Sequence, residues 1–148
     1  MNAANKLVVR RTIAATREEL FDAWLDAKSL QEWMRPGSVQ STRARVDPRV
    51  GGRYEIVMIG ENAEFAHNGE YRIIDRPAKL AFTWISRGTN DQPTLVTVEF
   101  LDRGRKTEVV LTHEGLPNEK SVADHTAGWS DILEKLDAKR PNAARTGR

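Results

Sequence analysis

The sequence predicts an α+β fold in which a curved antiparallel sheet of about seven strands packs around a long C-terminal helix. Apolar residues recur with a period of two through the middle of the chain, and with a helical period over residues 120–138. Each alternating segment has one apolar face. A sheet that is apolar on one side needs a second layer to cover that side, and the long helix is the element able to do so.

The N-terminal part predicts one strand followed by two short helices. Residues 6–14 are rich in β-branched side chains, which favour a strand. Thr16 and Glu19 have the spacing of a capping box, so we expect a helix to begin there. Its apolar stripe consists of Leu20, Phe21, Trp24 and Leu25. We expect Ser29 to cap the second helix, which ends before Pro36.

The middle of the chain predicts six further strands, at residues 39–46, 53–59, 65–74, 79–85, 94–101 and 106–113. Gly, Pro and Asn turn signals separate most of them, and the short connections favour a meander. The expected inward-facing residues are Tyr54, Ile56, Met58, His67, Gly69, Tyr71, Ile73, Leu80, Phe82, Trp84, Val96, Val98, Phe100, Thr107, Val109, Leu111 and His113.

Residues 120–138 predict the long helix that covers this face. Its apolar stripe consists of Trp129, Ile132, Leu133 and Leu136, and His125 lies one turn earlier. We expect Gly128 to let the helix approach the sheet closely, with space for a ligand as the alternative, and Trp129 to face Trp84. A curved sheet that faces a single helix leaves space between the layers, which predicts a cavity. We expect one domain over residues 1–138 and a basic, disordered tail over residues 139–148.

The composition argues against several classes of protein. There is no cysteine, and the three histidines lack the spacing of a zinc site, so we expect no metal and no cofactor. No apolar stretch approaches the roughly 20 residues that span a bilayer, so we expect a cytoplasmic protein with no membrane partner. The last ten residues hold four basic and no acidic side chains. The positive charge therefore belongs to the tail, and we expect no nucleic-acid partner.

Seven motifs follow one another in order along the chain. They are residues 11–14 (RTIA), 33–36 (WMRP), 47–54 (DPRVGGRY), 69–71 (GEY), 77–84 (PAKLAFTW), 107–113 (TEVVLTH) and 128–129 (GW). Over about Leu7 to Leu136 this set resembles the START-like (SRPBCC) superfamily, and within it the bacterial homologues of the activator of heat-shock protein 90 ATPase. The resemblance implies the helix-grip fold, whose relatives share a cavity rather than one reaction. They include lipid carriers, aromatic cyclases and co-chaperone domains.

The leading hypothesis is that the chain binds a small hydrophobic or aromatic ligand in the cavity between the sheet and the C-terminal helix. Burial of apolar ligand surface would drive binding, and a polar group such as Tyr71, His113 or His125 would orient the ligand. The residues expected to contact it are Trp33, Tyr54, Met58, Phe65, Tyr71, Phe82, Trp84, Val98, Leu111, His113, His125 and Trp129.

Two alternatives stay open. A cyclase-like or hydrolase-like enzyme would use the same cavity with an inward histidine as general base, but no catalytic triad or paired inward carboxylates assign a catalytic residue. A stress-related, co-chaperone-like module would bind a partner through an exposed apolar patch around Trp33 to Gly37. In a chain of this length, we expect no counterpart of the separate N-terminal domain with which the eukaryotic activator engages its chaperone. A homodimer is common among such small domains, but no residue requires one.

Overall fold

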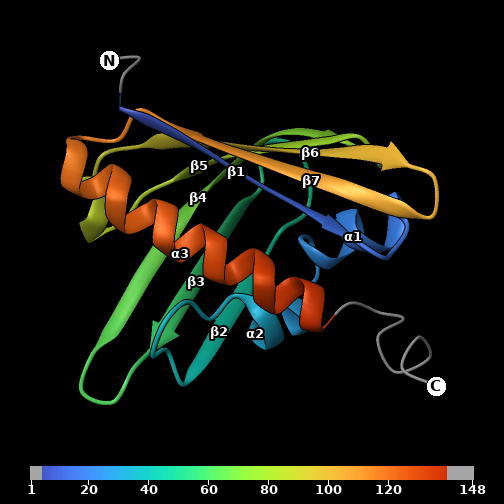
Figure 1. Ribbon diagram of the computed structural model, residues 1–148. Coiled ribbons are helices and arrows are strands. Elements are labelled where there is room, and N and C mark those ends of the chain that lie inside the picture. The colour runs from blue at the N-terminus through green and yellow to red at the C-terminus, as the bar shows by residue number, and fades with distance from the viewer. Residues whose placement is uncertain (1–4, 140–148) are drawn as a thin grey trace.

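In the computed structural model, which describes residues 5–139, one antiparallel sheet wraps around one side of a long helix (Figure 1). The elements are β1 (Lys6–Ile13), α1 (Arg17–Ala23), α2 (Ala27–Trp33), β2 (Ser41–Val46), β3 (Arg53–Ile59), β4 (Glu64–Asp75), β5 (Lys79–Trp84), the 3-10 helix η1 (Arg87–Thr89), β6 (Thr94–Arg103), β7 (Lys106–Glu114) and α3 (Glu119–Ala138). The predicted α+β fold class and the predicted order of elements are both confirmed.

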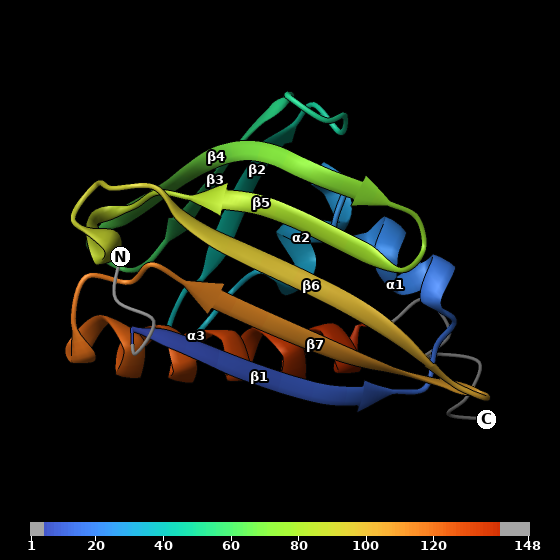
Figure 2. The ribbon, with the colours of Figure 1, turned by 90° about the horizontal axis from the view of Figure 1, so that it is seen from above.

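The seven strands form one sheet in the order β1-β7-β6-β5-β4-β3-β2, and every neighbouring pair is antiparallel. Strands β2 to β7 follow the predicted meander. The first strand instead pairs with the last one, with Leu7 opposite His113 and Ile13 opposite Thr107. Figure 2 shows α3 beneath β1 and β7, and Figure 1 shows β2, β3 and the start of β4 turning down past the helix. The sheet is therefore curved, as expected.

The two short helices begin with different caps. The capping box of α1 is present, since Thr16 Oγ1 accepts from the Glu19 amide and Glu19 Oε1 accepts from the Thr16 amide. The prediction that Ser29 caps α2 is wrong, because Asp26 caps it instead. Ser29 lies inside the helix, where its Oγ accepts from Trp33 Nε1 at 2.9 Å. The hydroxyl therefore satisfies a buried indole donor one turn away.

The alternation of inward and outward residues follows the prediction on β3, β5, β6 and β7. It fails on β4, where the register against β5 shifts between Tyr71 and Ile73. Ile73 is 38% exposed, whereas Ile74 packs against the core. An extra residue in one strand reverses which side chains point inward beyond it, and this explains the error.

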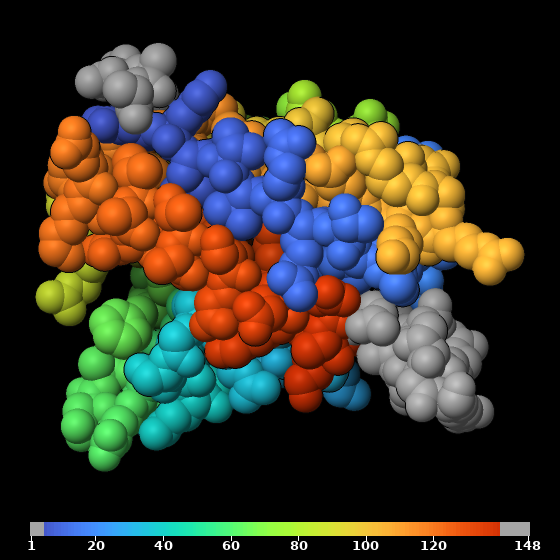
Figure 3. Space-filling view, in the orientation of Figure 1, coloured from blue at the N-terminus to red at the C-terminus, as the bar shows by residue number. Residues whose placement is uncertain are grey.

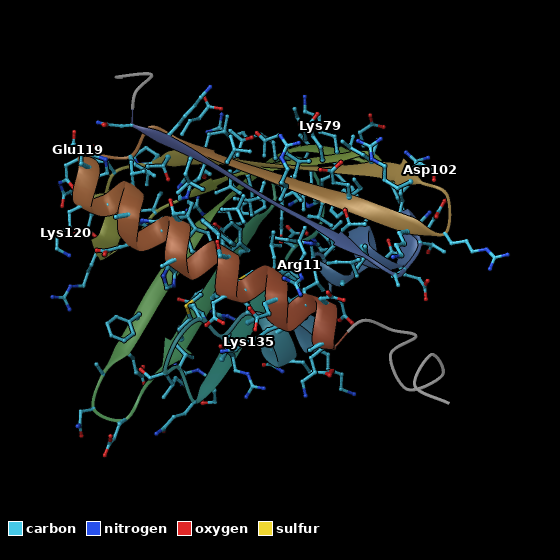
Figure 4. The ribbon with its side chains drawn as sticks, in the orientation of Figure 1. Arg11, Lys79, Asp102, Glu119, Lys120 and Lys135 are labelled. Atoms are coloured by element: carbon cyan, nitrogen blue, oxygen red, sulfur yellow. The ribbon has the colours of Figure 1, made fainter. Side chains whose placement is uncertain are left out.

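Polar contacts tie the C-terminal half of the long helix to β1 and to the loop before β2. The Arg11 Nε on β1 lies 2.9 Å from Asp137 Oδ2, and the Lys135 ammonium contacts the carbonyl of Arg35. Figure 4 shows Arg11 and Lys135 near this half of α3, with Glu119 and Lys120 at the other end.

The tail predicted over residues 139–148 lies outside the described residues, apart from Lys139, which caps the C-terminus of α3. The domain boundary at residue 138 therefore stays a prediction.

Candidate functional site

The interface between the sheet and α3 is filled with aromatic rings. The predicted pair is in place, because the ring centroids of Trp84 and Trp129 are 4.9 Å apart. Trp24 extends this cluster, with its centroid 6.2 Å from that of Trp129 and 4.8 Å from that of Trp33. A small cavity of about 10 Å³ remains beside Tyr54. It has room for about one water molecule, so the middle of the interface is closely packed.

The larger space is a hollow at the side of this interface, between the N-terminal half of α3, the loop before β2 and the β3–β4 hairpin. We call it the side hollow. Its inner part, about 150 Å³, has Trp84, Trp129 and Ile132 at its floor, and its outer part, about 520 Å³, reaches Phe65 and Gly88. The two parts share Pro36, Met58, His67, Asp124 and His125. Figure 3 shows the surface hollowed between the green hairpin and the orange helix.

Two tryptophans carry buried N–H groups that have no hydrogen-bond partner among the described residues. They are Trp24 and Trp84, each 3% exposed. Both rings border the small cavity, and Trp84 also lines the inner part of the side hollow. An unpaired buried donor costs about 1–3 kcal/mol, so such groups usually meet a water or a ligand acceptor.

His113, on β7, uses both ring nitrogens inside the protein. Trp129 Nε1 lies 3.0 Å from His113 Nδ1, and an indole can only donate, so Nδ1 carries no proton. His113 Nε2 therefore carries the proton and donates to Thr94 Oγ1 at 2.8 Å, while Thr94 Oγ1 donates to the Trp84 carbonyl at 2.6 Å. Burial lowers the pKa of His113 to about 3. This ring is neutral at physiological pH and has no nitrogen free for a ligand or a proton transfer.

His125, on α3, lies in the wall of the side hollow. Its Nδ1 is 2.8 Å from the Ser121 carbonyl, and the Ser121 hydroxyl donates to the Gly88 carbonyl at 2.7 Å. A Cβ built on Gly88 would lie 3.0 Å from His125 Cε1 and 3.4 Å from its Nε2. The edge of the ring that carries Nε2 therefore faces the loop that borders the hollow. Burial lowers the pKa of His125.

His67, on β4, completes this group of histidines. Its Nδ1 lies 3.3 Å from the Ile56 carbonyl, and its ring centroid is 4.7 Å from that of Trp84. Burial lowers the pKa of His67 to about 4. The ring centroids of His113 and His125 are 5.0 Å apart, and His67 and His125 both line the side hollow. Within residues 5–139, however, no group of three or more histidine and acidic side chains is arranged to hold a metal ion.

The residues predicted to contact a ligand fall into three groups. Those that border the side hollow are Met58, Phe65, Trp84, His125 and Trp129. Those that border the small cavity are Tyr54, Tyr71 and Phe82, as well as Trp84. Those that lie in the core and border neither space are Trp33, Val98, Leu111 and His113. The last group is almost completely buried, with Trp33 packed against Trp24 and the other three on the central strands β6 and β7.

Several residues of the hollow were not foreseen from the sequence. They are Pro36, Val39, Gly88, Asp124 and Ile132. Gly128, for which the sequence left open the alternative of making space for a ligand, also borders the hollow, and a Cβ at this position would meet only the Pro36 Cβ, at 3.9 Å. The expectation that Gly128 permits a close helix–sheet approach is therefore wrong. The positions of Pro36, Gly88 and Gly128 are plain in the sequence, but only the folded chain shows that they border one hollow.

The family model described as Activator of Hsp90 ATPase homolog 1-like protein matches residues 14–139. The chain belongs to this family. The match confirms the resemblance drawn from the ordered motifs. The comparison with curated proteins found no match to this chain. No helix within the described part of the chain is long and apolar enough to cross a bilayer.

Solved structures show that other proteins share this fold. A Chromobacterium violaceum protein has a TM-score of 0.79 at 20% identity, over 93% of this chain and 97% of that one. A Rhodobacter sphaeroides protein has a TM-score of 0.79 at 22% identity, over 94% of each chain. An HSP90 activator from Plasmodium falciparum has a TM-score of 0.73 at 25% identity, over 90% of this chain and 94% of that one.

Proposed function

We propose that this protein binds a small, mostly apolar molecule in the side hollow. The observation that carries the proposal is an apolar hollow, open to the outside, whose floor is made by Trp84 and Trp129. The outer part alone has the volume of an ordinary small-molecule site. The proposal moves the ligand from the closely packed middle of the helix–sheet interface to the side of it.

The driving force is the removal of apolar surface from water. A ligand that buries about 300 Å² of apolar surface gains about 7 kcal/mol before the cost of association is subtracted. We therefore expect affinities in the micromolar to millimolar range for simple aromatic probes. The aromatic floor favours flat, ring-containing ligands, because ring pairs gain energy beyond the area that they bury.

Gly128 provides the test, because a side chain added there would extend into the inner part of the hollow. We expect Gly128→Leu to abolish or greatly weaken the binding of β-naphthol and of its methyl ether, measured by isothermal titration calorimetry. Gly128→Ala should weaken it less. Both substitutions remove a helix-interior glycine, so neither should lower the free energy of unfolding.

The matched control is Ala127→Leu, which adds the same side chain at the exposed neighbouring position of α3. This variant should bind both probes like the wild type. If Gly128→Leu folds normally and still binds the probes with unchanged affinity, the ligand lies elsewhere and the proposal fails.

Partner binding is a second candidate, supported by the likeness to the Plasmodium falciparum HSP90 activator. The apolar patch expected around Trp33 to Gly37 does not support it, because Trp33 and Met34 are 1% and 0% exposed. This candidate predicts that the purified chain stimulates the ATPase of a purified Hsp90. An unchanged ATPase rate at saturating protein would argue against it.

Enzyme function, the third possibility, would have to use a histidine with an available nitrogen. His113 does not meet this condition, because both of its nitrogens are hydrogen-bonded inside the core. We propose no reaction and no catalytic residue.

A further inference from the structure

We infer that the ligand of the side hollow carries a hydroxyl group that donates a hydrogen bond to Nε2 of His125. The site would then select phenols and alcohols over molecules of the same shape that lack this donor. The inference rests on the proposed function of the hollow. It goes beyond that function by naming the polar group of the ligand and the residue that accepts its hydrogen bond.

The position of the proton on His125 follows from its neighbours. A carbonyl oxygen only accepts, so the Ser121 carbonyl, 2.8 Å away, requires a proton on Nδ1. The Ser121 hydroxyl is also 3.3 Å from Nδ1, but its hydrogen points to the Gly88 carbonyl, so it too can only accept from the ring. Both contacts place the proton on Nδ1. In the neutral ring, Nε2 is then a bare acceptor.

The surroundings of Nε2 favour a neutral donor as its partner. No described residue donates to this nitrogen, and His113 beside it is fully engaged. The charged groups that border the hollow are Asp124, which pairs with Lys120 at 2.8 Å, and Arg87 on the outer wall. The nearby rings of His67 and His113 are neutral, since burial lowers the pKa of each.

A ligand carboxylate would meet the lone pair of Nε2 instead of a donor, so it would be repelled unless His125 took up a proton. Burial lowers the pKa of His125 and opposes that uptake. A hydroxyl group needs no change of charge. It can give its hydrogen to Nε2 while the apolar body of the ligand lies against Met58 and Trp84.

The experiment compares β-naphthol with its methyl ether, which has the same ring system but no donor. We expect the wild type to bind the naphthol about tenfold more tightly than the ether. In His125→Leu, which removes the acceptor, the ratio of the two affinities should fall to about one. In His125→Gln, whose side-chain oxygen can also accept, part of the preference should return.

A spectroscopic measurement separates a direct contact from a structural effect of the substitutions. The nitrogen NMR resonance of His125 Nε2 should begin at the position of an unprotonated ring nitrogen. It should shift towards that of a hydrogen-bonded nitrogen with the naphthol and not with the ether.

The outcomes divide cleanly between this inference and the proposed function. If the wild type binds both probes equally, and Gly128→Leu blocks both, the hollow is a binding site but the hydroxyl inference is overturned. A naphthol preference that persists in His125→Leu also overturns the hydroxyl inference, because another residue must then accept the hydrogen bond from the hydroxyl. If neither probe binds, the proposed function and the inference fall together.

Discussion

The indole N–H of Trp129 on α3 donates to Nδ1 of His113 on β7 across 3.0 Å, and the two side chains are 2% and 0% exposed. This bond joins the helix to the sheet inside the core. It also begins a chain that continues from His113 Nε2 through the Thr94 hydroxyl to the Trp84 carbonyl. The chain links the helix to β7, β6 and β5, and every polar group in it has a partner.

We expect Trp129→Phe to lower the free energy of unfolding by about 3 kcal/mol, because it removes apolar volume and leaves His113 Nδ1 buried without a donor. Urea unfolding measures the loss. In a His113→Leu background the same substitution should cost less, since the acceptor is already gone. Additive losses in this double-mutant cycle would contradict a hydrogen bond between the two side chains.

The free energy of unfolding should decrease as the pH drops below about 6.5, the pKa of a solvated histidine. In the folded chain, burial lowers the pKa of His113 to about 3 and that of His67 to about 4. Above pH 6.5 these rings are neutral in both states, so they add no pH dependence. As the pH drops below this value, the unfolded chain binds protons that the folded chain does not, and the stability conferred by the neutral rings is lost towards the folded pKa values.

The slope should approach about 1.4 kcal/mol per pH unit for each of the two rings. Urea unfolding between about pH 7 and about pH 5 measures it above the range in which carboxylates titrate. His67→Phe, which keeps an aromatic ring against Trp84, should remove the contribution of His67 to the slope and leave those of His113 and of His125, whose pKa burial also lowers. A stability that does not change over this interval would show that the rings are protonated in the folded state.

Two glycines should respond in opposite ways to alanine. A Cβ on Gly69 would lie 2.7 Å from the Thr83 carbonyl carbon and 2.8 Å from Tyr54 Cε1, so Gly69→Ala forces backbone apart between β4 and β5. We expect a loss of about 3 kcal/mol or more in the free energy of unfolding. Gly128→Ala meets no such contact and should gain about 0.5–1 kcal/mol. Equal effects of the two substitutions in thermal or urea unfolding would contradict these contacts.

The loop that contains η1 should loosen when its bond to α3 is removed. Ser121 Oγ donates to the Gly88 carbonyl at 2.7 Å, so Ser121→Ala should cost about 1 kcal/mol and leave that carbonyl without this donor. We expect faster amide hydrogen exchange over residues 86–92, measured by mass spectrometry. Ser130→Ala, at an exposed position of the same helix, is the control and should leave the exchange of the loop unchanged.

The secondary structure was predictable where the signal is local. The capping box of Thr16 and Glu19 and the alternation on β5, β6 and β7 depend only on residues close in sequence. The errors occur where two local signals compete or where a strand is irregular. Asp26 and Ser29 are both residue types that favour the N-cap position. In the folded chain Asp26 caps α2, and Ser29 accepts a hydrogen bond from the Trp33 indole. The bulge after Tyr71 depends on the partner strand and leaves no pattern in β4 itself.

The site was harder to predict, because it depends on residues that are far apart in the sequence. The sequence indicated aromatic and histidine residues on inward faces, and five of the predicted contacts do border the side hollow. It could not distinguish His113 from His125. Both ring nitrogens of His113 are hydrogen-bonded, to Trp129 and Thr94, whereas Nε2 of His125 stays available. The two rings differ only in what the folded chain places beside them.

By itself, the sequence determined the order of strands and helices, the face that most of them bury and membership of the family, because periodicity, caps and motifs act over short spans of chain. Only the tertiary structure decided that β1 pairs with β7, that the middle of the interface is filled by tryptophan rings, and that the open space lies beside Pro36, Gly88 and Gly128. Space is what remains after side chains from distant segments have packed. It therefore depends on all of them at once and is encoded in no single segment.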